Sequence, residues 1–320
     1  MSDGDSLKQQ TVRGTIWSAI ERFSVQGIQF IILIVMARVL TPSDYGIVGM
    51  LTIFLAISQS LIDSGFSNAL IQKIDRTETD YATVFYFNIA VGGILYGIMY
   101  FSASGIADFY DIPELISVTR IISLLLLINS LSIVQRAIFT IRIDFKTQAK
   151  ASLIAVVISG IVGISMAYSG YGVWSIVAQT LVNQALCTIL LWFFSQWVPK
   201  WTFSYNSFKQ LFSFGSKLMI VGILDTLYRN IYTIVIGKKY SAANLGFYTR
   251  AEQFAQFPTS NFTGIMQRVT FPVLSQLQNE EERLPIAYIK ILRMSAFLIF
   301  PLGVGLACVA RPLILTLLNE

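Results

Sequence analysis

Ala37-Arg38-Val39-Leu40-Thr41-Pro42-Ser43-Asp44-Tyr45-Gly46 is a short polar turn between two long apolar runs, and it decides the fold. The runs on either side, residues 14–36 and 46–66, each hold about twenty mostly apolar residues, enough for one helix across a hydrocarbon layer roughly 30 Å thick. Proline disfavours helical geometry in the residue before it, so Thr41-Pro42 should end the first helix, and Ser43 or Asp44 should cap the second. The stretch therefore predicts a helical hairpin whose turn lies at one membrane face.

The composition supports a membrane protein with many spans. Hydrophobic residues make up 54% of the 320 residues, charged residues only 13%, and the mean hydropathy is +0.64. A soluble core could not bury this much apolar surface. The net charge of +5 is compatible with nucleic-acid binding, but the basic residues stand singly in short loops instead of forming one stripe. We therefore expect no nucleic-acid partner.

The sequence offers no metal, redox or cofactor motif. Its two cysteines, Cys187 and Cys308, lie inside apolar runs, and we expect both to pack as small hydrophobic residues. It contains no histidine, which removes the commonest general base and metal ligand. We expect no catalytic residue, metal or cofactor, and a protein that is not an enzyme.

Further apolar runs predict nine spans in total, joined by loops too short to hold a catalytic domain. The seven that follow the hairpin lie at 82–104, 115–138, 151–168, 172–195, 212–236, 246–273 and 286–310. Loops on the side of the N-terminus carry ten Lys and Arg residues, and loops on the other side carry four. By the positive-inside rule the N-terminus is cytoplasmic, and the opening turn lies outside.

A weak repeat with a period near 200 residues suggests two lobes. Residues 38–46 recur loosely as 238–246, and Gly14-Thr15 recurs as Gly215-Ser216. Six spans separate the copies, so both have the same orientation, as in transporters with parallel repeats. This predicts a first lobe at 1–200 with six spans and a partial second lobe at 201–320 with three. We expect a fragment that lacks the last spans; the alternative is a complete protein with nine.

Charged residues inside the first two spans mark a cavity, a pair or a pathway, because such residues are costly in a bilayer. The first span carries Glu21 and Arg22, and the second carries Asp63. With a rise of 1.5 Å per residue, Arg22 lies about 12 Å from the inner end of its helix, at a depth similar to that of Asp63 on the antiparallel neighbour. The two could pair, either as a structural salt bridge or as part of a transport pathway.

The first two spans of the second lobe are equally polar. Asp225 and Arg229 are spaced to neutralise each other across one helical turn. Two such hairpins facing each other would line a central cavity, whose excess of basic residues suits an anionic, phosphate-bearing cargo. The charged residues of these two spans are Lys217, Asp225, Arg229, Arg250, Glu252 and Arg268.

Several of these segments resemble a known family. Residues 37–46, followed by Leu61-Ile62-Asp63-Ser64-Gly65-Phe66 and Ala69-Leu70-Ile71, resemble the start of the polysaccharide transporters of the multidrug/oligosaccharidyl-lipid/polysaccharide (MOP) exporter superfamily, which include Wzx-type O-antigen flippases. Tyr248-Thr249-Arg250-Ala251 and Phe271-Pro272-Val273-Leu274-Ser275 resemble the eighth helix of that family.

The resemblance implies an all-α, MATE-like bundle of two six-helix lobes, of which this chain holds about nine helices. It implies a flippase in the bacterial inner membrane that moves undecaprenyl-diphosphate-linked oligosaccharide outward by ion-coupled alternating access. Its partners would be the lipid-linked oligosaccharide, the phospholipid bilayer, and the polymerase and glycosyltransferases of the same pathway. The expected cavity residues that bind the diphosphate are Arg22, Lys217, Arg229, Arg250 and Arg268, and the expected ion carriers are Glu21, Asp63, Asp225 and Glu252.

Three alternatives remain at this stage. A multidrug cation antiporter of the same superfamily should have a net acidic or aromatic cavity, whereas here five bases oppose four acids. A polyprenyl-sugar transferase or polymerase needs a sizeable outer loop, but residues 105–114 form a short one without metal-ligand spacing. The third alternative, a membrane scaffold, is disfavoured, because a scaffold has no use for the charges buried in these spans.

Overall fold

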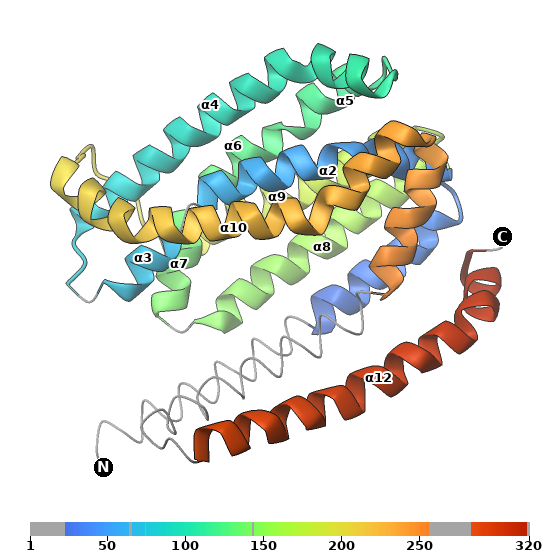
Figure 1. Ribbon diagram of the computed structural model, residues 1–320. Coiled ribbons are helices and arrows are strands. Elements are labelled where there is room, and N and C mark those ends of the chain that lie inside the picture. The colour runs from blue at the N-terminus through green and yellow to red at the C-terminus, as the bar shows by residue number, and fades with distance from the viewer. Residues whose placement is uncertain (1–22, 64–65, 74, 143, 256–282, 319–320) are drawn as a thin grey trace. The chain divides into compact units, whose positions relative to one another are not determined.

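The computed structural model describes residues 23–63, 66–73, 75–142, 144–255 and 283–318, and all regular structure in these ranges is helical (Figure 1). The chain divides into two compact units, Met1–Gly246 and Phe247–Glu320. The labelled helices of the first unit are α2 (Pro42–Asp63), α3 (Phe66–Gln72), α4 (Glu78–Tyr110), α5 (Leu115–Ile122), α6 (Leu124–Ser130), α7 (Ile133–Ile141), α8 (Phe145–Tyr168), α9 (Val173–Ser195) and α10 (Tyr205–Lys239). The second unit contains α12 (Arg283–Leu318).

The helices confirm the predicted membrane fold. In the described part of the chain, seven helical segments are long and apolar enough to cross a bilayer, and they correspond to the predicted second to seventh and ninth spans. The first span is described only as the shorter apolar helix Phe23–Ala37, and the eighth only as a helix over residues 242–255. The total of nine spans and the lobe boundary near residue 200 stay predictions.

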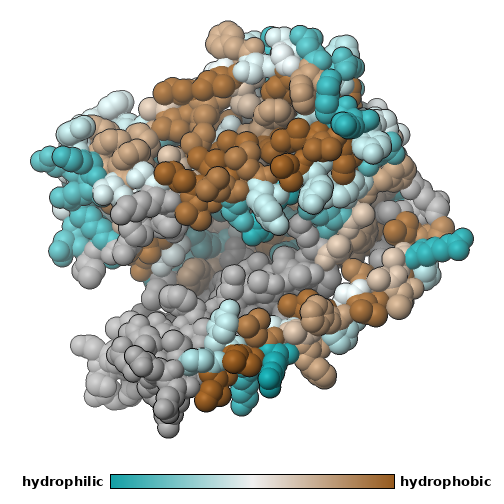
Figure 2. Space-filling view, viewed as in Figure 1, coloured by the Kyte–Doolittle hydropathy of each residue, from teal (hydrophilic) through white to brown (hydrophobic). Residues whose placement is uncertain are grey.

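The surface of the first unit has the pattern of a membrane protein. Figure 2 shows hydrophobic residues over the middle of this unit and hydrophilic residues gathered toward its ends. Large apolar side chains such as Phe101, Ile94 and Phe193 are more than 60% exposed, which is the arrangement expected where lipid replaces water.

The opening turn is capped at least two residues earlier than predicted. Thr41, not Ser43 or Asp44, caps α2: its hydroxyl accepts a hydrogen bond from the backbone N–H of Asp44 at 3.3 Å. Asp44 returns the contact, because its Oδ2 accepts from the Thr41 backbone N–H at 2.8 Å. Pro42 is the first helical residue, where its missing N–H has no intrahelical role. The turn is therefore a capping box with proline at the first position.

The fourth predicted span, at 115–138, is not one continuous helix. It consists of three helices, α5, α6 and α7. The breaks fall at serines whose hydroxyls bond to nearby backbone carbonyls. Ser123 Oγ donates to the Thr119 carbonyl at 2.6 Å, and Ser132 Oγ donates to the Asn129 carbonyl at 3.0 Å. Such local bonds compete with the helical ladder and bend helices.

The two cysteines differ. Cys187 is buried beside Ala151, Ala155 and Leu191, as predicted. Cys308 is exposed on α12, so the expectation that it packs in a core is wrong. Its apolar neighbours in the sequence belong to a helix whose described side chains are largely exposed.

Candidate functional site

Helices α2 and α10, which carry some of the predicted site residues, lie side by side and run antiparallel (Figure 1). Glycines on α10 allow their close approach. A Cβ at Gly222 would lie 2.9 Å from Ser60 Oγ, and a Cβ at Gly237 would lie 3.3 Å from Met50 Cγ. Small residues at such contacts are typical of helices packed within membranes. The seam between α2 and α10 is therefore tight at both of these points.

An ion pair lies on α10 at the middle of its apolar segment. Arg229 Nε is 2.9 Å from Asp225 Oδ2, one helical turn away, which confirms the predicted pairing. Arg229 is the central residue of the span Met219–Lys239. Its side chain is 73% exposed and that of Asp225 is 56% exposed.

Such exposure at mid-span restricts what this face of α10 can contact. An arginine or aspartate at the centre of a transmembrane helix costs about 2.5 to 3.5 kcal/mol on insertion scales. Ionisable residues at this depth therefore face a water-filled cavity or the interior of a bundle instead of lipid. Asp225 and Arg229 are thus expected to mark a face of α10 that contacts a water-filled cavity or the interior of a bundle instead of lipid.

The structure places the other predicted site residues only in part. Arg250 and Glu252 share the helix over residues 242–255; Arg250 is 7% exposed and Glu252 is partly exposed. Lys217 belongs to α10 and Asp63 to the last turn of α2, but the positions of their side chains are not described. Glu21, Arg22 and Arg268 lie outside the described residues, and so does the predicted pairing of Arg22 with Asp63.

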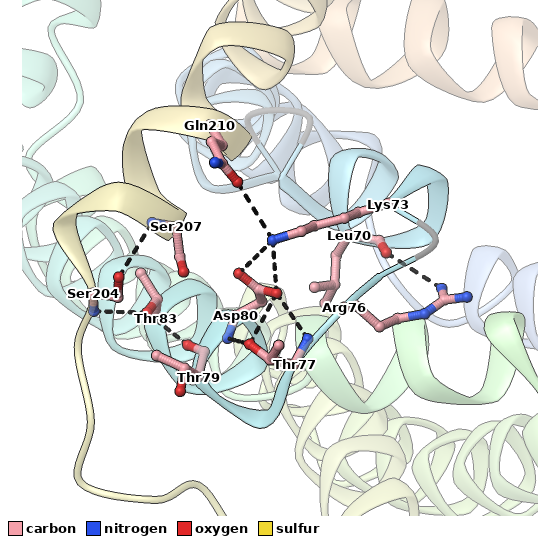
Figure 3. A network of polar contacts seen from close by, with 10 residues as sticks. All are labelled: Leu70, Lys73, Arg76, Thr77, Thr79, Asp80, Thr83, Ser204, Ser207 and Gln210. Carbon is pink, nitrogen blue, oxygen red and sulfur yellow. Dashed lines mark hydrogen bonds and ion pairs between the residues drawn. The ribbon is translucent and has the colours of Figure 1, made fainter.

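A second charged cluster, which the sequence reading missed, joins α3, α4 and α10 (Figure 3). Lys73 Nζ lies 2.9 Å and 2.8 Å from the two carboxylate oxygens of Asp80, and 3.5 Å from Gln210 Oε1 on α10. A further bond between these helices runs from the Ser204 backbone N–H to Thr83 Oγ1 at 3.1 Å. The start of α10 is thus held to the start of α4.

Asp80 has two roles in this cluster. It is the third residue of α4, where its Oδ2 accepts from the backbone N–H of the N-cap Thr77 at 2.8 Å and completes a capping box. A carboxylate here is also favoured by the helix dipole. The side chain is fully buried, so Lys73 compensates a charge that has left water. The sequence signal that could have found it is Thr77-Glu78-Thr79-Asp80 before an apolar run.

A chain of side-chain amides crosses the interior of the first unit. Gln184 on α9 donates to Asn129 on α6, and Asn129 donates to Gln59 on α2. The residue before Gln184, Asn183, donates to Ser159 of α8 at 3.1 Å. These bonds pair partly buried polar groups, and they tie α2 to the pair α8 and α9.

The chain is similar in sequence to known proteins along nearly its whole length. The sequence pattern of the family described as "Polysaccharide biosynthesis protein" matches residues 35–320. The chain is 29% identical over 318 residues to the teichuronic acid biosynthesis protein TuaB of Bacillus subtilis (strain 168), covering 98% of the chain and 66% of that protein. It is 24% identical over 308 residues to the lipopolysaccharide biosynthesis protein WzxC of Escherichia coli (strain K12), covering 96% and 63%.

A solved structure shares the fold. It is the inward-facing conformation of a multidrug resistance MATE family transporter of the MOP superfamily, with a TM-score of 0.69, 17% identity, and coverage of 94% of this chain and 75% of that one. The chain spans about two thirds of the length of the curated relatives it matches.

Proposed function

Because the chain belongs to the polysaccharide biosynthesis protein family, we propose that it forms part of a flippase that moves a lipid-linked oligosaccharide across the bacterial inner membrane. The observation that carries the proposal is the exposed ion pair of Asp225 and Arg229 at the centre of a span. A guanidinium that borders water at this depth is suited to the diphosphate of a polyprenyl carrier, which it can bind through two parallel hydrogen bonds.

The pair also suggests how cargo and ion are coupled. An incoming diphosphate competes with Asp225 for the guanidinium of Arg229, which is 2.9 Å away. Once Arg229 has turned to the phosphate, Asp225 loses its compensating charge and gains affinity for a proton or a cation. We propose that Asp225 carries the coupling ion for this reason, with Glu21, Asp63 and Glu252 as further candidates.

The proposal also includes further cavity residues, an orientation in the membrane and partner proteins, all of which rest on the sequence. Arg22, Lys217, Arg250 and Arg268 are, from the sequence, the further proposed residues that bind the diphosphate. The N-terminus is cytoplasmic, and the polymerase and glycosyltransferases of the pathway are the expected partners. The alternative is a multidrug cation antiporter with this fold, in which the acidic residues alone contact the cargo.

Complementation of a gene deletion tests the proposal. We expect Arg229→Ala to abolish surface polysaccharide and to leave lipid-linked repeat units on the inner leaflet, a loss of export far larger than any drop in the amount of protein in the membrane. Arg229→Lys should restore part of the export, because a lysine binds phosphate as a point charge without the bidentate geometry. Lys239→Gln, which removes a cation from the last turn of the same helix, is the matched control and should export normally. Normal polymer in the Arg229→Ala strain would rule out the assigned role.

A further inference from the structure

The two copies of the repeated motif touch each other through their glycines. A Cβ at Gly46 would lie 1.8 Å from the carbonyl oxygen of Ala242, and a Cβ at Gly246 would lie 1.8 Å from the carbonyl oxygen of Pro42. Both distances are far below any van der Waals contact, so neither position has room for a side chain. The contact is reciprocal, since each glycine packs on the first turn of the other helix.

The two helix starts are also built alike. The hydroxyl of Ser241 accepts from the backbone N–H of Asn244 at 3.3 Å, just as Thr41 accepts from Asp44 at 3.3 Å. Each glycine follows two residues after the capped N–H. The crossing therefore has local two-fold symmetry, which an isologous contact requires. This symmetry gives the sequence repeat a structural meaning.

An apolar layer lies directly beside the crossing. Tyr110 Cε1, Leu245 Cδ2 and Met50 Cγ all lie within 3.3 Å of the point that a Cβ on Gly237 would occupy. Met50 is 1% exposed, Leu245 0% and Tyr110 6%. These side chains come from α2, from the second motif and from the end of α4, so they fill the space between α2 and α10 beside the crossing.

We propose that the reciprocal crossing of Gly46 and Gly246, with the layer of Met50, Tyr110 and Leu245, is the outer closure of the transport pathway. The proposal rests on the proposed function, because only a transporter needs this end to open. Helices that meet backbone to backbone over a few residues, with apolar side chains beside them, separate without breaking a buried ion pair. Release of cargo to the outer leaflet requires the two helix starts to move apart and expose Met50.

The first test uses Gly46→Ala and Gly246→Ala in the full protein. Each should force the helix starts apart and favour the outward-open state. The reporter is a cysteine introduced by Met50→Cys, with Cys308→Ser removing the exposed native thiol. A membrane-impermeant maleimide added to intact cells should label the reporter at least tenfold faster in either alanine variant than in the parent. Gly97→Ala, whose Cβ meets nothing within 4 Å, is the matched control and should label at the parent rate.

A second test leaves both glycines in place and does not depend on the folding of the alanine variants. Oxidation of the double variant Met50→Cys, Leu245→Cys should cross-link the closure and stop export, and a reductant should restore it. Parent-rate labelling in alanine variants that reach the membrane, a failure of the pair to cross-link, or full export by cross-linked protein would each overturn the proposal.

Labelling and cross-linking need no cargo, which separates this proposal from the proposed function. If the gene deletion leaves surface polysaccharide unchanged while labelling responds to the glycines, the closure stands and the assigned cargo falls.

Discussion

Lys73 Nζ lies 2.8 Å from Asp80 Oδ2, and the Asp80 side chain is fully buried while that of Lys73 is 27% exposed. The pair connects the loop after α3 to the first turn of α4, and Lys73 extends it to Gln210 on α10. The loop after α3, the start of α4 and the start of the distant α10 therefore meet at one buried charge. Because Asp80 is the more deeply buried partner, loss of Lys73 should destabilise the cluster more than loss of Asp80.

Removal of the lysine should be strongly destabilising. Lys73→Ala leaves the Asp80 carboxylate buried without its cation, and the loss of one partner of a buried pair typically costs about 3 to 5 kcal/mol. The double variant Lys73→Met, Asp80→Asn removes both charges and should recover a large part of that loss. Thermal unfolding of the purified protein in detergent measures both effects. Lys209→Ala, which changes an exposed lysine on α10, serves as the control; an equal loss in it would contradict the assignment.

The cap of α2 gives a sharper comparison between neighbours. Thr41→Ala removes the hydroxyl that accepts from the Asp44 N–H and should cost about 1 kcal/mol of stability. Ser43→Ala, two residues later in the same turn, should be close to neutral because Ser43 is not the cap. The same unfolding assay decides between them. A larger loss for Ser43→Ala would support the cap expected from the sequence over the one observed.

The sequence predicted spans well because a membrane helix is specified locally, by a run of apolar residues. It misplaced the cap of α2 because a proline can be the first helical residue as readily as it can end the preceding helix. It missed the breaks near Ser123 and Ser132 because these depend on hydroxyl bonds to the backbone inside an otherwise apolar run.

The candidate site was predictable only where it depends on the spacing of residues within one helix. The pair of Asp225 and Arg229 follows from spacing on one helix and was found. Gln210 lies 137 residues from Lys73, and nothing in the sequence near either residue indicates their contact. The repeat was visible as a faint similarity between residues 38–46 and 238–246, but the reciprocal packing of Gly46 and Gly246 is a property of the folded backbone.

The ion pair on α10 can be tested by reversing it. Arg229→Ala and Asp225→Ala each leave one unpaired charge at mid-span, where it costs about 2.5 to 3.5 kcal/mol, and both should lower protein levels or stability. The exchange variant Arg229→Asp, Asp225→Arg keeps the pair but moves the cation one turn along the helix. We expect it to restore membrane levels without restoring export. Recovery of export together with protein level would show that the pair is only structural.

The predicted orientation rests on charge counting and can be checked directly. A cysteine introduced by Ser43→Cys should react with an impermeant maleimide in intact cells, because the opening turn is expected outside. A cysteine introduced by Lys146→Cys, near the start of α8, should react only after the cells are opened. Both reporters need the Cys308→Ser background. Labelling in the opposite order would reverse the topology.

The contact between α4 and α6 provides a test of packing in which the neighbour can be changed as well. A Cβ at Gly92 would lie 2.9 Å from both Cβ and Oγ of Ser130, so Gly92→Ala should cost about 1 to 3 kcal/mol through overpacking. Ser130→Gly removes both atoms, and the double variant should be more stable than Gly92→Ala alone. Rescue should be incomplete, because the Leu126 carbonyl oxygen still lies 3.2 Å from the new methyl group. Gly93→Ala, where a Cβ meets nothing within 4 Å, is the adjacent control and should be neutral or slightly stabilising. A double-mutant cycle on unfolding free energies isolates the pairwise term, and additive effects would mean that α4 and α6 do not meet through these two residues.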